Sequence, residues 1–283
     1  MPFISSTTGS FYAGRRSVAG AWSPETDITT STWIDASNTA KYTASGTNLS
    51  TVNDVRDNSN YDVNGTVQTN STTLNGLNVF EFNGTQSISS TGPTAQVSSG
   101  NHWAIGVFRW DTVDSNKDSI WSFETNGSPK RDYAVSSGNA SNSWPGELDL
   151  DNLSSDRVST TIGDKQEWDL ESLTRYQWHI VAVFFNKTGN QIGVRVDGSN
   201  AFTPVNDYDN SLQTNQKLQI MRNRASQKLE GGFAEFFAVA DVPGTGGTDI
   251  SILEKAEGYL AHKWGRTSAL PNSHPYKSSA PTS

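Results

Sequence analysis

The chain has 283 residues, a net charge of −8 and 18% charged residues. This acidic balance argues against nucleic acid as a partner, because affinity for phosphates comes mostly from Lys and Arg. The absence of cysteine excludes disulfides and thiolate metal sites, and it fits assembly in a reducing cytoplasm. We find no signal peptide and no apolar run of membrane-spanning length, so we expect a soluble protein that is not inserted into a membrane.

Residues 1–30 are polar and glycine-containing, without a sustained hydrophobic period. The segment nevertheless carries apolar and basic side chains of the kind that fill pockets on a partner or pair with its carboxylates. These are Phe3, Ile4, Phe11, Tyr12, Trp22, Arg15 and Arg16. A disordered terminus is the ordinary alternative for such a sequence. We predict an extended attachment arm over 1–30 and one domain over 31–283.

From Trp33 onwards, short apolar runs alternate with polar turns rich in Ser, Thr, Asn and Gly. Strands are predicted at 79–82, 102–110, 119–123, 178–185, 191–196, 217–221 and 232–239. Asn186–Asn190 and Asp197–Gly198 are turn signals, and 136–165 is expected to form long loops at one edge. Many short strands with little helix predict an all-β fold, an antiparallel two-sheet sandwich.

One amphipathic helix is predicted over residues 250–265. Its apolar stripe is Leu253, Ala256, Leu260 and Trp264, and its polar face is Glu254, Lys255, Glu257 and Lys263. Ser251 and Glu254 have capping-box spacing, and Gly265 can end the helix in a left-handed conformation. A lone amphipathic helix must bury its stripe, so we expect it to lie against the sheet. The Pro-containing tail after it is expected to run extended.

Several spaced motifs resemble LamG-type, concanavalin A-like lectin/glucanase domains. They are Trp33-Ile-Asp-Ala-Ser37, the polar turn from Asn53 to Asn58, the hairpin motif Leu74 to Gly84, and Glu257 to Gly265 followed by His274-Pro-Tyr-Lys277. The resemblance covers roughly residues 30–277. It implies a concanavalin A-like jelly roll, of a kind common in proteins of bacteriophages and marine bacteria, and leaves the activity open.

The candidate catalytic residues are Glu147, Asp149 and Asp151, which alternate and would share one face of a strand. The run resembles the acidic motif of retaining β-glucanases, which implies Glu147 as nucleophile, Asp149 as its modulator and Asp151 as acid/base. Asp151 departs from that motif, because a glucanase has the longer Glu there. The run from Glu167 to Glu171 is a second near match without the glucanase flanks. An ordinary exposed strand face is the stronger interpretation.

Calcium is the one cofactor for which the sequence offers ligands, since LamG domains often hold it. Asp149, Asp151 and Asp156 are the candidate carboxylates, although the run lacks EF-hand order. Solvated acidic loops are the competing interpretation.

Glycan binding would use loop aromatics that stack on sugar rings beside groups that hydrogen-bond hydroxyls. The candidates are Tyr133, Trp144, Asn142, Asp207, Tyr208 and Asp209. Most other tryptophans lie in periodic segments and are expected in the core.

These observations predict a non-enzymatic phage virion surface protein, assembled in the host cytoplasm, as a head decoration, head fibre or tail component. Its arm would bind other virion proteins, and its lectin-like sandwich would bind host glycans or neighbouring subunits. We expect a homo-oligomer on the particle. The alternative is a retaining β-glucanase.

Overall fold

The computed structural model describes residues 21–92, 102–111, 118–125, 131–137, 147–151, 166–169, 176–186, 191–200, 216–222, 229–239 and 250–283. Within 131–169 the described segments are characterised by their backbone alone.

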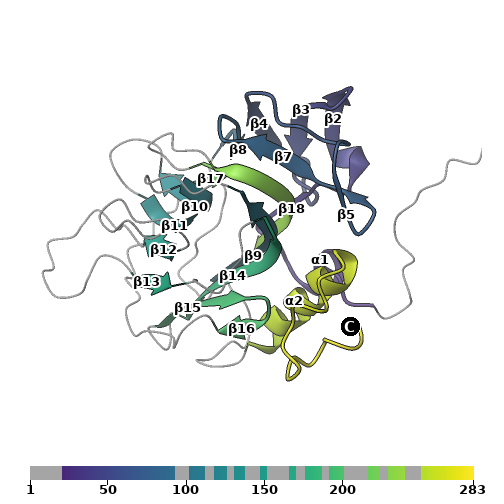
Figure 1. The fold of residues 1–283 in the computed structure, drawn as a ribbon, viewed down its shortest axis with the longest axis vertical. Helices are drawn as coiled ribbons and strands as arrows, with labels where there is room; N and C mark the ends of the chain where they lie inside the picture. The colour runs from purple at the N-terminus through teal and green to yellow at the C-terminus, as the bar shows by residue number, and fades with distance from the viewer. Residues whose placement is uncertain are drawn as a thin grey trace, which may run out of the picture.

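Two antiparallel sheets form the body of the molecule (Figure 1). The seven-stranded sheet has the order β1 (Thr32–Asp35), β18 (Glu230–Val239), β9 (His102–Trp110), β14 (Trp178–Asn186), β15 (Gln191–Val196) and β16 (Ser199–Asn200), and β7 (Phe80–Asn83) also pairs with β18. The nine-stranded sheet has the order β13 (Gln166–Asp169), β12 (Glu147–Asp151), β11 (Arg131–Ser137), β10 (Asp118–Thr125), β17 (Gln216–Ile220), β8 (Ser87–Ser90), β4 (Asn60–Asn64), β3 (Asn48–Asn53) and β2 (Tyr42–Ser45). The predicted two-sheet sandwich of jelly-roll type is confirmed.

Small elements connect these strands. A hairpin of β5 (Thr73–Leu74) and β6 (Leu77–Asn78) turns at Asn75 and Gly76, whose φ angles are 52° and 75°. Two left-handed residues in succession make the two-residue turn that Asn-Gly favours. The Asp197–Gly198 turn between β15 and β16 has the same character, with φ angles of 48° and 79°. The short helical turns are α1 (Pro24–Asp27) and η1 (Thr39–Lys41).

The first core lies between the two sheets and is apolar. Alternation along the strands points Phe108 of β9 and Phe236 of β18 inward, where Phe236 meets Trp121 of β10 with ring centroids 5.4 Å apart. Ile88 and Ile220 complete the opposite wall from the nine-stranded sheet, and both are fully buried.

The second core lies between the outer face of the seven-stranded sheet and helix α2 (Ser251–Lys263). The four residues of the predicted stripe are buried there, which confirms it. Opposite them lie Trp103, Ile105 and Ile180 from the sheet. The molecule therefore has three layers, two sheets and a helical layer, and Figure 1 shows the helix with the C-terminal segment on one side of the β9–β14 region.

Three predictions about the ends of the domain were wrong. The helix has Ile250 as its N-cap with no side-chain cap hydrogen bond, so the predicted capping box at Ser251 does not form. At the other end, Gly265 is left-handed with φ of 67°, as predicted. The tail after the helix is a series of turns rather than an extended strand, because the N–H groups of Ala269, His274 and Lys277 each bond a carbonyl three residues back.

The third correction concerns the predicted arm over 1–30. Residues 21–30 belong to the folded body, and Trp22 is 4% exposed in the second core. Its N–H donates to the carbonyl of Pro281 at 3.1 Å, and Ala21 bridges Thr282. Trp22 therefore fills a pocket in its own chain instead of one on a partner.

Candidate functional site

Strand β18 carries a β-bulge close to the C-terminal end of helix α2. The pairing with β9 shifts between Phe233 and Glu235, and Ala234 and Glu235 both lie toward the helix. A bulge redirects side chains in this way because an extra residue interrupts the alternation. It brings the carboxylate of Glu235, which is fully buried, into the layer between the sheet and the helix.

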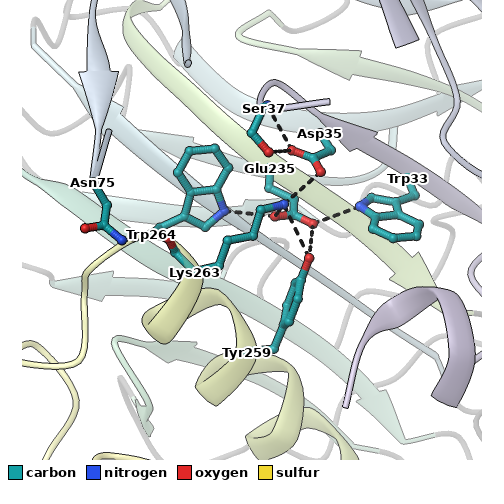
Figure 2. Close-up of polar contacts among 8 residues, drawn as sticks. All are labelled: Trp33, Asp35, Ser37, Asn75, Glu235, Tyr259, Lys263 and Trp264. Carbon is teal, nitrogen blue, oxygen red and sulfur yellow. Dashed lines mark hydrogen bonds and ion pairs between the residues drawn. The ribbon is translucent and has the colours of Figure 1, made fainter. Parts of the chain in front are cut away.

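Four donors surround the Glu235 carboxylate, as Figure 2 shows. The indole N–H of Trp33 and the hydroxyl of Tyr259 donate to Oε1 at 2.9 and 3.2 Å. The indole N–H of Trp264 and the ammonium of Lys263 donate to Oε2 at 2.8 and 2.6 Å. A buried carboxylate is tolerated only when it is paired and hydrogen-bonded, and this arrangement meets that condition.

Lys263 connects this carboxylate to a second one. Its Nζ lies 2.7 Å from Asp35 Oδ2, and the other oxygen of Asp35 accepts from the N–H and the hydroxyl of Ser37 at 2.9 and 2.6 Å. We call Trp33, Asp35, Glu235, Tyr259, Lys263 and Trp264 the Glu235 cluster. It joins the W-x-D-x-S motif of the N-terminal half to the helix motif of the C-terminal end.

The electrostatics of the cluster follow from burial. Burial raises the pKa of Glu235, and Lys263 opposes that rise. Burial by itself would lower the pKa of Lys263, but the charge of Glu235, followed by Tyr259 and Asp35, raises that pKa above its ordinary value. Lys263 therefore remains a cation that neutralises the buried carboxylates.

A second buried ion pair fixes the middle of the helix. Nε and Nη2 of Arg195 on β15 donate to the two oxygens of Glu257 at 2.7 and 2.9 Å, and His274 Nε2 lies 3.1 Å from the same carboxylate. Glu257 was predicted on the polar face of the helix, and Lys263 with it. Both predictions were wrong, because Glu257 is fully buried and the Lys263 side chain is 18% exposed.

The remaining motif residues also make structural contacts. Asp54, from the polar turn, accepts the N–H of Trp33 at 2.8 Å and the hydroxyl of Tyr61 at 3.0 Å. Asn75, at the tip of the β5–β6 hairpin, donates its amide to the carbonyl of Lys263 at 2.9 Å and so caps the end of α2. The motif residues thus meet around helix α2. Their hydrogen bonds and ion pairs hold the helical layer to the seven-stranded sheet.

The candidate acidic residues fall on neighbouring strands. Glu147, Asp149 and Asp151 occupy alternate positions of strand β12 (Glu147–Asp151), so the expectation of long loops over 136–165 was wrong for this segment. Asp169 and Glu167 of β13 are the register partners of Glu147 and Asp149. Paired positions share a face of a sheet, so the two near matches to the glucanase motif lie side by side in the backbone.

Other candidate residues are placed differently or lie outside the described residues. Tyr133 was predicted in a loop, but it lies in strand β11 opposite Phe123. Outside the described residues lie Phe3, Phe11, Tyr12, Arg15, Arg16, Asn142, Trp144, Asp156, Asp207, Tyr208 and Asp209.

Within the described part of the chain, no three His, Asp or Glu side chains are grouped so that they could hold a metal ion. No helix among those residues has the length and hydropathy needed to span a membrane.

One exposed aromatic residue was missed by the sequence reasoning. Tyr176, just before β14, is 67% exposed, and its φ of 66° is left-handed. The sequence gives a weak signal at most, because the residue precedes a strand without a Gly or Asn to mark the turn.

Comparison with known proteins identifies the fold. No family model and no curated protein matches the sequence. Domain 4 of AbnA, a GH43 extracellular arabinanase from Geobacillus stearothermophilus solved with arabinotriose, is similar with a TM-score of 0.51 and 14% identity, over 74% of this chain and 91% of that one.

Two toxin domains have a similar architecture. The botulinum neurotoxin serotype D binding domain has a TM-score of 0.53 and 14% identity, over 83% of this chain and 53% of that one. The botulinum neurotoxin type G receptor binding domain has a TM-score of 0.52 and 10% identity, over 81% of this chain and 50% of that one. The present chain thus spans about half the length of the toxin chains. At these identities the likeness establishes a shared β-sandwich fold.

Proposed function

We propose that this chain is a non-catalytic virion surface protein of a bacteriophage, whose sandwich binds host glycans or neighbouring subunits. The observation that supports the proposal is that the acidic motif residues form internal hydrogen bonds and ion pairs. The acidic motif residues Asp35, Asp54 and Glu257, together with Glu235 from strand β18, are each bound by donors from their own chain. Because these carboxylates lock layers together, the motifs supply a stable scaffold, and binding is left to the periphery.

The similar structures support a binding role. Domain 4 of the arabinanase was solved with arabinotriose, and both toxin domains are binding domains. Sandwiches of this type place loops at their ends, where ligand contacts can vary without disturbing the core. We extend a binding role to this chain, with glycans on the host surface as the ligand class.

The test of glycan binding uses the purified full chain on an array of neutral and sialylated oligosaccharides. We expect reproducible binding to a restricted set of glycans. If the folded protein binds no glycan, the lectin role is wrong and contacts with neighbouring subunits remain as the role of the sandwich.

The attachment role assigned to the N-terminal segment requires a corrected deletion. Residues 21–30 are part of the body, so the variant should lack residues 1–20 only. We expect nearly unchanged melting but loss of incorporation into particles. A variant that lacks residues 1–24 is the matched control, because it also removes Trp22 from the second core and should melt at a lower temperature. Normal incorporation of the shorter deletion would refute the attachment role.

The alternative, a retaining β-glucanase, keeps one specific observation in its favour. Glu147 and Asp149 of β12 face Asp169 and Glu167 of β13 in register. Assay of the purified protein on β-glucans, beside Glu147→Gln, decides between the two functions. Hydrolysis that disappears in Glu147→Gln would overturn the non-catalytic proposal.

A further inference from the structure

Tyr176 differs from the other large apolar side chains of the described residues. It alone among them is strongly exposed, at 67%. A single exposed aromatic residue is common on protein surfaces and carries no meaning by itself. Tyr176 is distinguished further by its backbone conformation, by the contacts that hold its backbone and by the charged groups near it.

The backbone of Tyr176 is left-handed, with φ of 66°. This conformation is uncommon and strained for a bulky residue, whereas Gly or Asn would adopt it with less strain. The fold obtains no buried contact in return, since the side chain is exposed. Strain of this kind is a reason to look for a role outside folding.

The base of the side chain is held firmly. The N–H of Tyr176 donates to the carbonyl of Trp110 at 3.0 Å, which ties it to the end of β9. Two residues later, Trp178 is 9% exposed and lies across β18, where a Cβ added to Gly232 would come within 2.5 Å of the indole. An aromatic ring on a fixed base loses little conformational freedom when it binds a ligand.

Trp110, which accepts the backbone N–H of Tyr176, is flanked in sequence by the charged residues Arg109 and Asp111. The guanidinium of Arg109 lies 5.3 Å from the ring centre of Trp178 and donates to both oxygens of Asp111 at 2.7 Å. It also donates to the two oxygens of Glu81 at 3.2 and 2.7 Å. Among the described residues at this place, one cation faces two carboxyl groups, so this trio carries no positive excess that would attract an anion.

We infer that Tyr176 is the stacking residue of a subsite for a neutral sugar, at the end of the seven-stranded sheet where β9 ends and β14 begins. The apolar face of a pyranose can lie on the exposed ring, and the exposed amide of Gln177 can bond its hydroxyls. The carboxyl groups of Glu81 and Asp111 disfavour sialylated or other acidic sugars. This inference rests on the proposed glycan-binding function and names its ligand class and one of its contacts.

The experiment combines the array with titration of the neutral oligosaccharide that binds best. Tyr176→Ala should weaken binding by about tenfold or more, because a central aromatic contact is lost. Tyr176→Phe should retain affinity, since the ring and not the hydroxyl stacks. Asn58→Ala, at another exposed left-handed position, is the matched control and should bind as the wild type does.

Stability is the second readout. Tyr176→Asn should melt at or above the wild-type temperature, because Asn tolerates the left-handed backbone, and it should bind as weakly as Tyr176→Ala. A large loss of melting temperature would show that the ring is structural and would overturn the inference.

The outcomes separate the two proposals. If the wild type binds neutral glycans and Tyr176→Ala binds them equally well, this subsite is wrong and the glycan-binding function stands. A preference for sialylated glycans would also overturn the inference while leaving that function intact. If the wild type binds no glycan at all, both fail.

Discussion

The two faces of the seven-stranded sheet bury different kinds of side chain. The inner face meets the nine-stranded sheet through apolar residues such as Phe108, Val183 and Phe236. The outer face meets the helical layer through an apolar set that also contains the buried ion pairs of Glu235 and Arg195. Both interfaces are well buried, but among the described residues the fully buried carboxylates Glu235 and Glu257 lie in the outer one.

The difference follows from what each interface must specify. Two sheets present wide alternating faces, and a shift of one residue would expose every inner side chain, so pattern alone fixes their pairing. A single helix has a narrow stripe and can rotate or slide on an apolar surface at small cost. Directional hydrogen bonds that involve Glu235 and Glu257 fix the position of the helix. We propose that the buried charges serve to set this position.

The largest effect is expected from Trp264→Ala. The substitution removes a fully buried indole from the helical layer and takes one donor from Glu235. We expect a loss of about 3–5 kcal/mol in the free energy of unfolding, because a cavity is left as well as a lost contact. Chemical denaturation measures it, and Trp264→Phe, which retains most of the volume, is the control. A loss below about 1 kcal/mol would show that the helical layer is peripheral.

Lys263→Met tests the charged part of the same layer. The variant leaves Glu235 and Asp35 without their cation, and breaking a buried ion pair in this way costs about 3–5 kcal/mol. The double variant Lys263→Met with Glu235→Gln should recover part of the loss, since the buried charge is then removed. Equal stability of the single and double variants would mean that the two residues are not coupled.

The pH dependence of the Lys263→Met penalty has a defined sign. The pKa of Lys263 is raised in the folded state, so its contribution is fully present below its unfolded pKa of about 10.4 and is lost as pH rises through the folded value. The penalty should therefore be constant from about pH 6 to 9 and shrink above about pH 10.5. A penalty that grows with pH in that upper range would contradict this assignment.

A conservative substitution in the inner core should have a smaller effect. Ile220→Leu keeps the volume of a fully buried apolar side chain and should cost less than about 1.5 kcal/mol. The equally conservative Glu235→Gln changes one atom of the Glu235 cluster and removes the charge that pairs with Lys263, so it should cost more. If Ile220→Leu is the more damaging of the two, the two interfaces do not differ in the way described.

The smallest effect is expected at the end of the helix. Asn75→Gly removes the exposed amide that caps the carbonyl of Lys263 and keeps a residue that accepts the left-handed φ of 52°, so it should cost about 0.5 kcal/mol, the low end for a single hydrogen bond. Asn78→Ala, in the same hairpin, is the comparison, because its amide bonds Asn70 and Tyr42 instead of the helix. Hydrogen exchange in the last turn of α2 should increase only in Asn75→Gly.

The sequence determined the sheet architecture because strand alternation is local. The predicted strand over 102–110 coincides with β9, and Leu253, Ala256, Leu260 and Trp264 are buried as their spacing requires. The predicted Asp197–Gly198 turn is confirmed, since left-handed positions favour these residues, and the Asn75–Gly76 turn lies in the hairpin that the family resemblance implied.

Tertiary structure alone decided the partners of the charged residues. Glu257 and Lys263 follow a helical period that puts them on the polar face, yet Glu257 is buried and Lys263 is partly buried, and they pair with Arg195 and Glu235 from other parts of the chain. The bulge that turns Glu235 toward the helix has no local sequence signature, and the pocket for Trp22 is made by the chain's own C-terminal end. Such contacts depend on which segments meet after folding, and a local hydrophobic period contains no information about that.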